Sequence, residues 1–314
     1  MSKNLPRTLL EATRYFADPQ VCIDFVAKLR WPDGPVCPSC EGTEHYWLSS
    51  RGLWKCKVRD CHRQFSVKQG TIFEDSAIPL DKWLCSIWLI ANSKNGVSSH
   101  ELGRAVGINQ KAAWFVLHRI RLAMRTGTFQ KLDGEVEVDE TYIGGAAKNV
   151  RKGDRARKLT VRGGIADKKM VVGSLQRTTE EQASQVVAEV MLETKWNSPR
   201  GHVVRNVEPG AAVYTDAAIG YRALTGDYKH QAVDHHIGEY ARGRVSTNGI
   251  ENFWALLKRS LHGTYVAVDE AHLWRYVDER VFAFNLRDLT DLERFQTVLR
   301  RIAGRRLTWT ELTA

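Results

Sequence analysis

Two closely spaced pairs of cysteines most strongly limit what the first part of this chain can fold into. Two residues separate Cys37 from Cys40, four separate Cys56 from Cys61, and 15 lie between the pairs. This spacing is typical of four thiolates that surround Zn²⁺ as a tetrahedron. Because such a shell leaves no position for water, the metal would stabilise a small module rather than catalyse a reaction. We therefore predict a zinc ribbon with a structural Zn²⁺ over residues 35–70.

The two remaining cysteines have a different setting. Cys22 and Cys85 lie among apolar residues, in QVCIDFV and WLCSIWLI, and we expect both in the core. Six cysteines in a chain of 314 residues, four of them in tight pairs, favour a metal site over a disulfide framework. Four unrelated buried thiols remain the alternative to the zinc site.

The periodicity of the apolar residues divides the rest of the chain. Residues 1–34 have apolar positions at helical spacing, broken at Pro19, which predicts two short helices. Residues 71–130 also have a helical pattern. Alternating strand patterns then indicate a mixed α/β domain over residues 131–290. We predict a helical tail over residues 291–314.

Within the α/β domain, individual segments have distinct patterns. The expected strands are EVEVDETYI, LTVRGGIAD, KMVVGSLQ and AAVYTD. We predict a helix over TEEQASQVVAEVMLETKW, and further helices from AAVYTD to the end of the chain. The basic loop NVRKGDRARK is either a solvated connection between strands or a contact to a DNA backbone.

The charge balance indicates the class of partner. The net charge is +10 and the isoelectric point is near 9.4, which favours a polyanion, with nucleic acid as the first candidate. Hydrophobic residues make up 43% of the chain and charged residues 26%, as in ordinary globular proteins. The absence of a long apolar run, and an N-terminus interrupted by charges, predict a cytoplasmic, nucleoid-associated protein without a membrane partner.

The segment VSSHELGRAVGINQKAAWFVLHRIR predicts a helix-turn-helix. Ser98 or Ser99 begins one helix, Gly107 lies in the turn, and Asn109 caps the next helix. Basic residues on the exposed side of the last helix could meet phosphates while the helix enters a major groove. The side chains for which we predict this DNA contact are Lys111, His118, Arg119 and Arg121.

Three acidic residues lie far apart in the sequence. Asp139 lies in EVEVDETYI, on the same strand face as Glu137, and Asp216 ends AVYTD. Glu251 lies on the amphipathic segment TNGIENFWALLKR, with Lys258 two helical turns further along the same face. Carboxylates suit Mg²⁺, and two ions about 4 Å apart can activate the attacking oxygen and stabilise the leaving oxygen of a phosphodiester. The pattern suggests DNA strand cutting and joining.

Each acid also has an ordinary structural interpretation. An isolated acid at the end of a strand is usually solvated. Asn248 could be a helix N-cap with Glu251 as its capping-box partner three residues later. From the helix alone the two interpretations of Glu251 are equally supported.

Several motifs follow one another behind the cysteine pairs: VEVDETYIGG, VYTD, TNGIENFWALLKR, GTYVAVDEAHLWRYVDE and FAFNLR. In these motifs and their order the chain resembles bacterial insertion-sequence transposases of the DDE type. It is most similar to the zinc-ribbon group related to the eukaryotic Merlin elements, over about residues 15–290. The resemblance implies an RNase H-like catalytic core that uses two Mg²⁺ ions, with Mn²⁺ as an alternative. The expected fold class is therefore α+β and multi-domain, with a zinc ribbon and a helix-turn-helix before an RNase H-like α/β core.

The resemblance also implies roles for individual residues. Asp139, Asp216 and Glu251 would be the first, second and third catalytic acids and the Mg²⁺ ligands. Lys258 would be the basic residue that follows the third acid and contacts DNA. Some relatives use Asn as the third catalytic residue, which makes Asn248 the alternative to Glu251. Ser246 stands where relatives often have a His before the Thr-Asn pair.

The leading functional hypothesis is a transposase that binds terminal inverted repeats and target DNA as double strands. Synapsis of two ends implies a homodimer or a higher assembly. A second hypothesis is a domesticated transposase that binds DNA without cutting it, and a third is an RNase H-like nuclease without strand transfer. The retained acids and Lys258 favour an enzyme over a binder.

Overall fold

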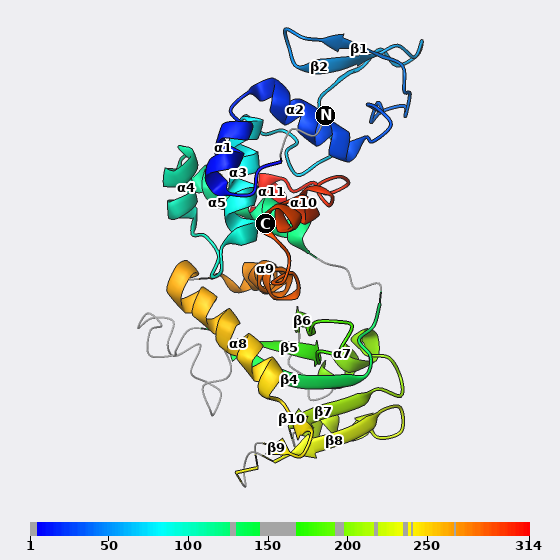
Figure 1. The fold of residues 1–314 in the computed structure, drawn as a ribbon, viewed down its shortest axis with the longest axis vertical. Helices are drawn as coiled ribbons and strands as arrows, with labels where there is room; N and C mark the ends of the chain where they lie inside the picture. The colour runs from blue at the N-terminus through cyan, green and yellow to red at the C-terminus, as the bar shows by residue number, and fades with distance from the viewer. Residues whose placement is uncertain are drawn as a thin grey trace. The chain divides into compact units, whose positions relative to one another are not determined.

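The computed structural model describes residues 5–125, 130–144, 168–191, 198–216, 219–234, 238–239, 241–266 and 268–314. The chain folds as two compact units (Figure 1). Residues 1–125 and 288–314 form one, here called the helical unit, and residues 126–287 form the other, the sheet unit. The predicted strand LTVRGGIAD and the basic loop NVRKGDRARK lie outside the described residues.

The helical unit begins with the two predicted helices. Helix α1 spans Leu9–Tyr15 and starts with a capping box, in which the Thr8 and Glu11 side chains accept each other's backbone N–H groups. Helix α2 spans Pro19–Arg30. Its proline occupies the first helical position, where no N–H is needed, so the predicted break at this residue is confirmed.

A small antiparallel sheet follows α2. Strands β1 (His45–Leu48), β2 (Leu53–Cys56) and β3 (Gln64–Phe65) pair in the order β1-β2-β3. One face of this sheet packs on Trp31, whose ring centroid lies 5.5 Å from that of Trp54 and 6.0 Å from that of Phe65. The predicted small β unit is therefore present.

Three helices form the middle of the helical unit: α3 (Leu80–Asn92), α4 (Ser99–Val106) and α5 (Gln110–Met124). The predicted signals at the α4–α5 connection are confirmed. Ser98 forms a capping box with Glu101, Gly107 ends α4 in the left-handed conformation, and the Asn109 side chain accepts from the N–H of Ala112.

Residues 291–314, which we predicted as a helical tail, contain two helices and belong to the helical unit. Helix α10 (Asp291–Leu299) places the Phe295 ring 5.0 Å from Trp88 and 5.8 Å from Phe16. A short helix, α11 (Trp309–Thr313), ends the chain. The apolar face of α10 is buried by aromatic residues far away in the sequence, and this contact holds the segment within the helical unit.

The sheet unit is built on five strands: β4 (Glu135–Ile143), β5 (Lys169–Gln176), β6 (Gln185–Val190), β7 (Ala212–Asp216) and β8 (Lys229–Val233). Their order across the sheet is β6-β5-β4-β7-β8. The first three strands along the chain pair antiparallel, whereas β7 is parallel to β4 and β8 is parallel to β7.

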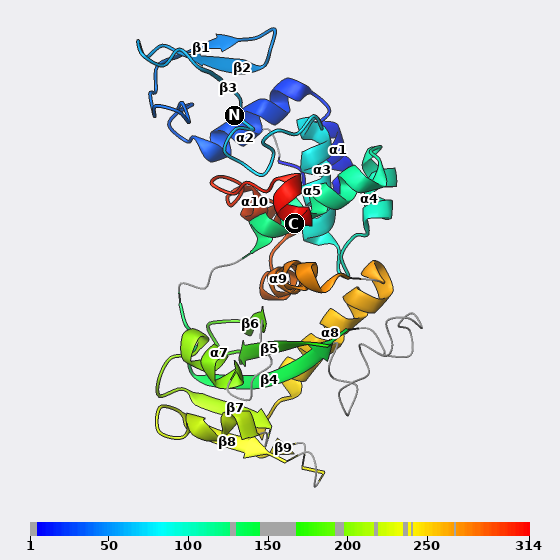
Figure 2. The ribbon, with the colours of Figure 1, turned by 180° about the vertical axis from the view of Figure 1, so that it is seen from behind.

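Helices cover both faces of this sheet (Figures 1 and 2). On one face, α8 (Asn248–Ser260) and α9 (Leu273–Asn285) share a core with side chains of β5 and β6. On the other, α7 (Ser198–Asn206) and the 3₁₀ turn η2 (Ile219–Leu224) pack against β4. A hairpin of β9 (Ala241–Arg242) and β10 (Val245–Ser246) leads into α8, and a π-helical turn, η4 (Leu261–Tyr265), follows it.

Two expectations for the sheet unit were wrong. The segment predicted as a helix over residues 179–196 contains strand β6, and β8 with the hairpin occupies a region where only helices were expected. Both faces of β6 are covered, with Val186 and Ala188 in one core and Val187 in the other. The alternation of apolar and polar residues that indicates a strand is therefore lost.

Candidate active site and metal centre

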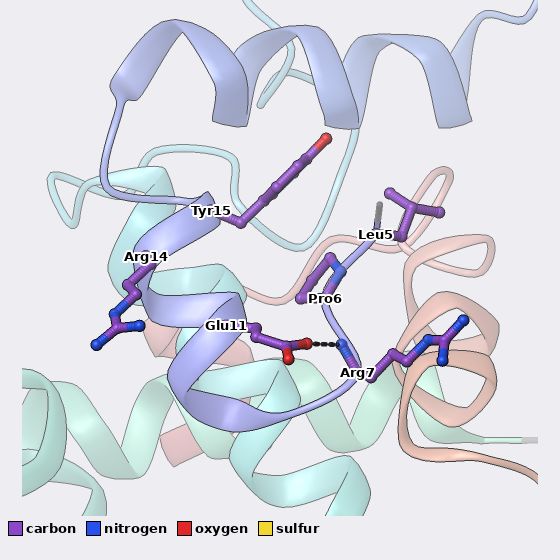
Figure 3. A pocket seen from close by; sticks show the side chains of 6 residues that line it. All are labelled: Leu5, Pro6, Arg7, Glu11, Arg14 and Tyr15. Carbon is purple, nitrogen blue, oxygen red and sulfur yellow. Dashed lines mark hydrogen bonds between the residues drawn. The ribbon is translucent and has the colours of Figure 1, made fainter. Parts of the chain in front are cut away.

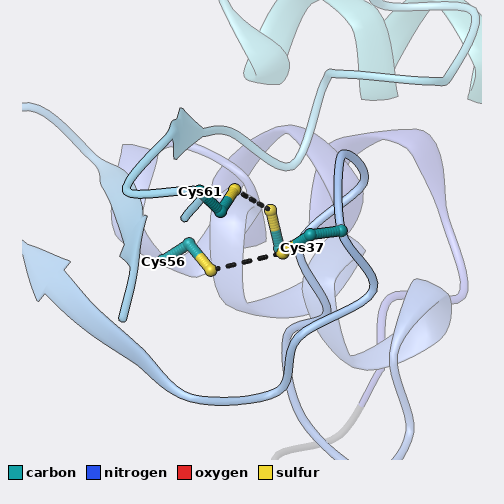
Figure 4. Close-up of side chains that lie close together, drawn as sticks. Cys37, Cys56 and Cys61 are labelled. Carbon is teal, nitrogen blue, oxygen red and sulfur yellow. Dashed lines mark hydrogen bonds between the residues drawn. The ribbon is translucent and has the colours of Figure 1, made fainter. Parts of the chain in front are cut away.

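The four paired cysteines meet in one place, and Figure 4 labels three of them, Cys37, Cys56 and Cys61. Cys37 and Cys40 lie between α2 and β1, Cys56 ends β2, and Cys61 precedes β3. Their sulfur atoms all lie within 4.8 Å of one another. Among the described residues, this is the one group of three or more His, Cys or acidic side chains compact enough to hold a metal. The four thiols fit a closed structural zinc shell.

The ionisation of these thiols also favours a bound cation. Burial opposes the charge on Cys37, yet backbone N–H groups of Ser39 and Cys40 and the neighbouring thiols lower its pKa to about 7. An N–H from Gly42 lowers the pKa of Cys40, but burial and the other thiols outweigh it and raise that pKa to about 12. Because one thiolate disfavours the next, a divalent cation is needed to keep all of them charged.

The fold places two of the three predicted acids, Asp139 and Asp216, on neighbouring strands. We had expected Asp139 at the end of a strand, but it lies in the middle of β4. Asp216 is the last residue of β7. The parallel register that pairs Glu137 with Tyr214 puts Asp139 level with Asp216. Both therefore project from the same face of the sheet, the face that α8 covers.

Asp139 lies close to other carboxylates on both faces of the sheet. Burial, together with the charges of Glu140 and Asp216, raises the pKa of Asp139 to about 7. Burial and Asp216 also raise the pKa of Glu140, although the Tyr221 hydroxyl donates to this carboxylate at 2.5 Å and partly offsets the effect. A divalent cation would relieve this repulsion, and carboxylate oxygens are the donors that Mg²⁺ prefers. Among the described residues, however, Asp139, Asp216 and Glu251 do not form a group of three close enough to hold one ion.

Helix α8 is held against β4 by its first turn. The Glu137 carboxylate, 3% exposed as a residue, accepts from the backbone N–H of Ile250 at 3.0 Å. It also accepts from Arg177 Nε at 2.7 Å. Arg177 in turn donates to the backbone oxygens of Arg244 and Ser246, just before α8. A buried acid at the positive end of a helix is favourable, and here it sets where α8 begins on the sheet.

The third acid lies on this helix. Glu251 is exposed in the first turn of α8, where its Oε1 accepts from the Thr247 hydroxyl at 2.7 Å. Asn248 is the first helical residue and Thr247 is the N-cap, so the interpretation of Asn248 as an N-cap with Glu251 as its capping-box partner is wrong. Glu137 supplies that acceptor instead. Lys258 is exposed further along α8, as its helical spacing from Glu251 predicts.

The predicted DNA-contact residues of α5 divide into two groups. Lys111 is exposed, with its Nζ 4.5 Å from the centre of the Trp309 ring. His118, Arg119 and Arg121 are at most 3% exposed, so our expectation that they form an exposed basic face is wrong. Arg119 donates to the backbone oxygens of Leu307, Ile72 and Glu74 at 2.7 to 3.0 Å. Arg119 therefore joins the C-terminal residue Leu307 to Ile72 and Glu74 within the helical unit.

Sequence reasoning missed three residues that position the acids: Glu137, Arg177 and Trp254. Glu137 was placed correctly on the face of Asp139, but nothing local indicated a helix N-terminus above it. Arg177 follows β5 in an otherwise ordinary polar connection. Trp254 lies among the apolar residues of TNGIENFWALLKR, yet its indole N–H donates to Asp139 at 3.0 Å. A polar atom in an apolar stripe was the available signal.

A hollow in the helical unit lies beside α1 (Figure 3). It is lined by Leu5, Pro6, Arg7, Glu11, Arg14 and Tyr15. Its single acid, Glu11, already accepts from the backbone N–H of Arg7 at 2.7 Å and from that of Thr8 at 3.3 Å. The hollow therefore offers no free acidic group for metal or acid–base chemistry.

None of the helices in the described ranges has the length and the apolar composition that a membrane-spanning segment needs.

Comparison with known proteins gives two family matches and one similar protein. Residues 131–285 match the family described as ISXO2-like transposase domain, and residues 18–64 match the transposase zinc-ribbon domain. The chain is also similar to an uncharacterised protein in the transposable element ISH50 of Halobacterium salinarum. The two are 27% identical over 253 residues, which cover 78% of this chain and 84% of that protein. The first match contains all three acids, and the second contains the four cysteines.

Proposed function

We propose that this chain, which belongs to the ISXO2-like transposase family, is an active transposase that cuts DNA at the ends of its element and joins those ends to a target. The observation that carries the proposal is the alignment of Asp139 with Asp216 on neighbouring parallel strands. A protein that only bound DNA would have no need to bury one carboxylate beside others at the cost of raising its pKa.

The arrangement of the sheet supports an RNase H-like core. Three antiparallel strands followed by two parallel strands that add on the other side of the first describe this fold, with acids on its first and fourth strands. Asp139 lies on the first strand of the sheet and Asp216 on the fourth. The third acid comes from a helix over the same face, which is the place of Glu251 on α8.

Each residue then has a chemical role. Asp139, Asp216 and Glu251 would hold two Mg²⁺ ions, or Mn²⁺ in their place. When bound, the ions activate the attacking oxygen and stabilise the oxygen that leaves the phosphodiester. Lys258, exposed on α8, would bind a DNA phosphate near the acids. Asn248 stays the alternative third residue because it is exposed in the same helical turn.

We propose fewer DNA-contact residues on α5 than the sequence alone predicted. Lys111 remains the proposed contact on α5, whereas the buried His118, Arg119 and Arg121 are withdrawn as direct contacts. The excess of basic residues, a net charge of +10, supports binding to phosphates that weakens as salt increases. Because two ends must be held together for joining, we propose that the working form is a homodimer or larger.

The test uses purified full-length protein, DNA that carries the element's ends, a target plasmid and Mg²⁺. We expect Asp139→Asn and Asp216→Asn to reduce cutting and joining below detection while end binding stays within about twofold, because an amide keeps the shape of a carboxylate and loses its charge. Asp227→Asn, an exposed acid between β7 and β8, is the matched control and should cut normally. Full cutting by the Asp139 and Asp216 variants would refute the proposal.

The same assay assigns the third acid and the reaction type. Glu251→Gln should fail like the aspartate variants, and normal cutting by Glu251→Gln with failure of Asn248→Ala would transfer the role to Asn248. Cutting without joining at any target concentration would identify a nuclease instead of a transposase. Lys258→Ala should reduce joining more than it reduces metal binding, and normal joining would remove Lys258 from the site.

A further inference from the structure

One hydrogen bond connects the first acid to helix α8. The indole Nε1 of Trp254 donates to Oδ2 of Asp139 at 3.0 Å. Trp254 is 3% exposed, and its ring lies in the core between α8 and the sheet. An indole N–H can only donate, so this contact requires an acceptor, and it occupies one oxygen of the carboxylate.

Strand β5, next to β4, has a glycine where the indole ring of Trp254 passes over it. Gly173 of β5 pairs directly with Asp139 in the sheet. A Cβ at this position would lie 2.7 Å from Cη2 and 2.8 Å from Cζ2 of Trp254, closer than side-chain carbons approach. It would also lie 3.1 Å from Cδ1 of Ile250. No other amino acid fits here without displacing the indole, so Gly173 provides the space that lets Trp254 reach Asp139.

The helix that carries the indole is itself fixed at its start. One turn before Trp254, the N–H of Ile250 donates to Glu137, which lies two residues before Asp139 on the same face of β4. Two successive contacts therefore tie α8 to β4. The indole consequently has little freedom to follow the carboxylate if that carboxylate rotates.

We infer that Trp254 is a positioning residue for Asp139: it fixes Oδ2 and so sets the orientation in which the carboxylate would meet a catalytic cation, and Gly173 is the shape requirement for that contact. This rests on the proposed function, because Asp139 is taken as a metal ligand. Partners that orient a ligating side chain typically change metal affinity or activity by about 10-fold to 100-fold when they are lost. A residue that only filled the core would affect stability and leave metal affinity unchanged.

The test separates the N–H from the aromatic ring. Trp254→Phe keeps an aromatic ring in the core and removes the donor, while Trp274→Phe on α9 is the matched control in the same unit. Mn²⁺ is titrated into the full-length protein bound to uncut end DNA, and the free ion is followed by its electron paramagnetic resonance signal. Thermal unfolding is measured in parallel.

We expect Trp254→Phe to raise the Mn²⁺ concentration for half-occupancy about 10-fold, with a similar rise in the concentration needed for half-maximal cutting. Trp274→Phe should match the unaltered chain. Gly173→Ala should resemble Trp254→Phe if it folds, because the added methyl group displaces the indole. A Trp254→Phe variant with unaltered Mn²⁺ occupancy and cutting would overturn the inference.

The Asp139→Asn variant shows which proposal has failed. If it loses Mn²⁺ binding while Trp254→Phe does not, the acid is a ligand and the indole is only core packing, so the inference alone is wrong. If Asp139→Asn binds Mn²⁺ and cuts like the unaltered chain, the proposed function fails and the inference fails with it.

Discussion

The zinc ribbon and the proposed acidic site are assembled from side chains that come together by opposite routes. The most distant cysteines of the ribbon, Cys37 and Cys61, are 24 positions apart. In the sheet unit, Asp139 and the indole that contacts it are 115 positions apart. The ribbon is therefore a local structure closed by its metal, whereas the acidic site is assembled by strand register and helix packing.

This difference predicts opposite dependence on metal. The ribbon has short strands and a small aromatic face, too little apolar burial to fold a module without its ion. The acidic site lies on a five-stranded sheet with a helix-covered core on each face, which folds without help from a cation. Zinc should stabilise the ribbon, and Mg²⁺ should mainly relieve repulsion between carboxylates that are already in place.

Loss of a zinc ligand should have the largest effect. We expect Cys40→Ser to abolish zinc binding and unfold residues 35–70, because structural zinc contributes on the order of 10 kcal/mol to such modules. Hydrogen exchange should increase over the ribbon and stay unchanged over β4 and β5. Cys85→Ser, a half-buried cysteine of α3 outside the cluster, is the control and should retain zinc. Zinc-free native protein would contradict the comparison.

The helical unit also contains a contact between residues far apart in the sequence. This contact tests whether a dependence on tertiary packing follows from sequence separation rather than from the unit in which a residue lies. Arg119 joins α5 to Leu307, 188 positions away. Arg119→Ala should destabilise this unit by about 4 kcal/mol, because buried carbonyl groups lose their donor. Lys111→Ala on the exposed side of the same helix should leave stability unchanged and weaken end-DNA binding. Equal urea midpoints for the two variants would contradict the structural role of Arg119.

The burial of Asp139, together with repulsion from Glu140 and Asp216, predicts an unusual pH dependence of stability for the protein without Mg²⁺. Asp139 has a pKa of about 7 in the folded chain, against 3.8 for an ordinary aspartate. Between these values the folded chain binds a proton that the unfolded chain has lost, so stability falls as pH rises from about 4 to 7. With allowance for partial hydration, the loss should be on the order of 2 kcal/mol.

Asp139→Asn should remove this loss, so the variant should exceed the unaltered chain in stability at pH 8 and match it at pH 4. The free energy of unfolding is measured in urea at each pH, in the presence of a chelator that removes Mg²⁺ and leaves zinc bound. Saturating Mg²⁺ should reduce the difference at pH 8. Parallel stability profiles for the two proteins would show that Asp139 is not strained by its neighbours.

The smallest effect should come from a local cap. Ser98→Ala removes the side-chain acceptor at the start of α4 and should cost about 1 kcal/mol. Ser99 is the first helical residue, and its side chain does not accept from a backbone N–H at the start of α4. Ser99→Ala should therefore lower the free energy of unfolding by less than Ser98→Ala. Circular dichroism during urea unfolding of the two variants provides the comparison, and equal midpoints would remove the capping box as a contributor.

The sequence by itself determined the features whose cause is local. The four cysteines specified their cluster by spacing, Pro19 marked the start of α2, and Ser98, Gly107 and Asn109 marked the ends of α4 and α5. Alternation within VEVDETYI also placed Glu137 and Asp139 on one face of β4. In each case the physical cause acts within a few residues, through a cap, a backbone conformation or the pleat of a strand.

Only the tertiary structure decided which groups meet across long separations. Strand β6 was mistaken for a helix because both its faces are buried, and burial depends on which helices arrive later in the chain. Arg119 and Arg121 look like DNA contacts in an isolated helix, but the C-terminal residues cover α5. The indole of Trp254 reaches Asp139 because Gly173 lies opposite that acid. Register and packing select such partners, and no local pattern records them.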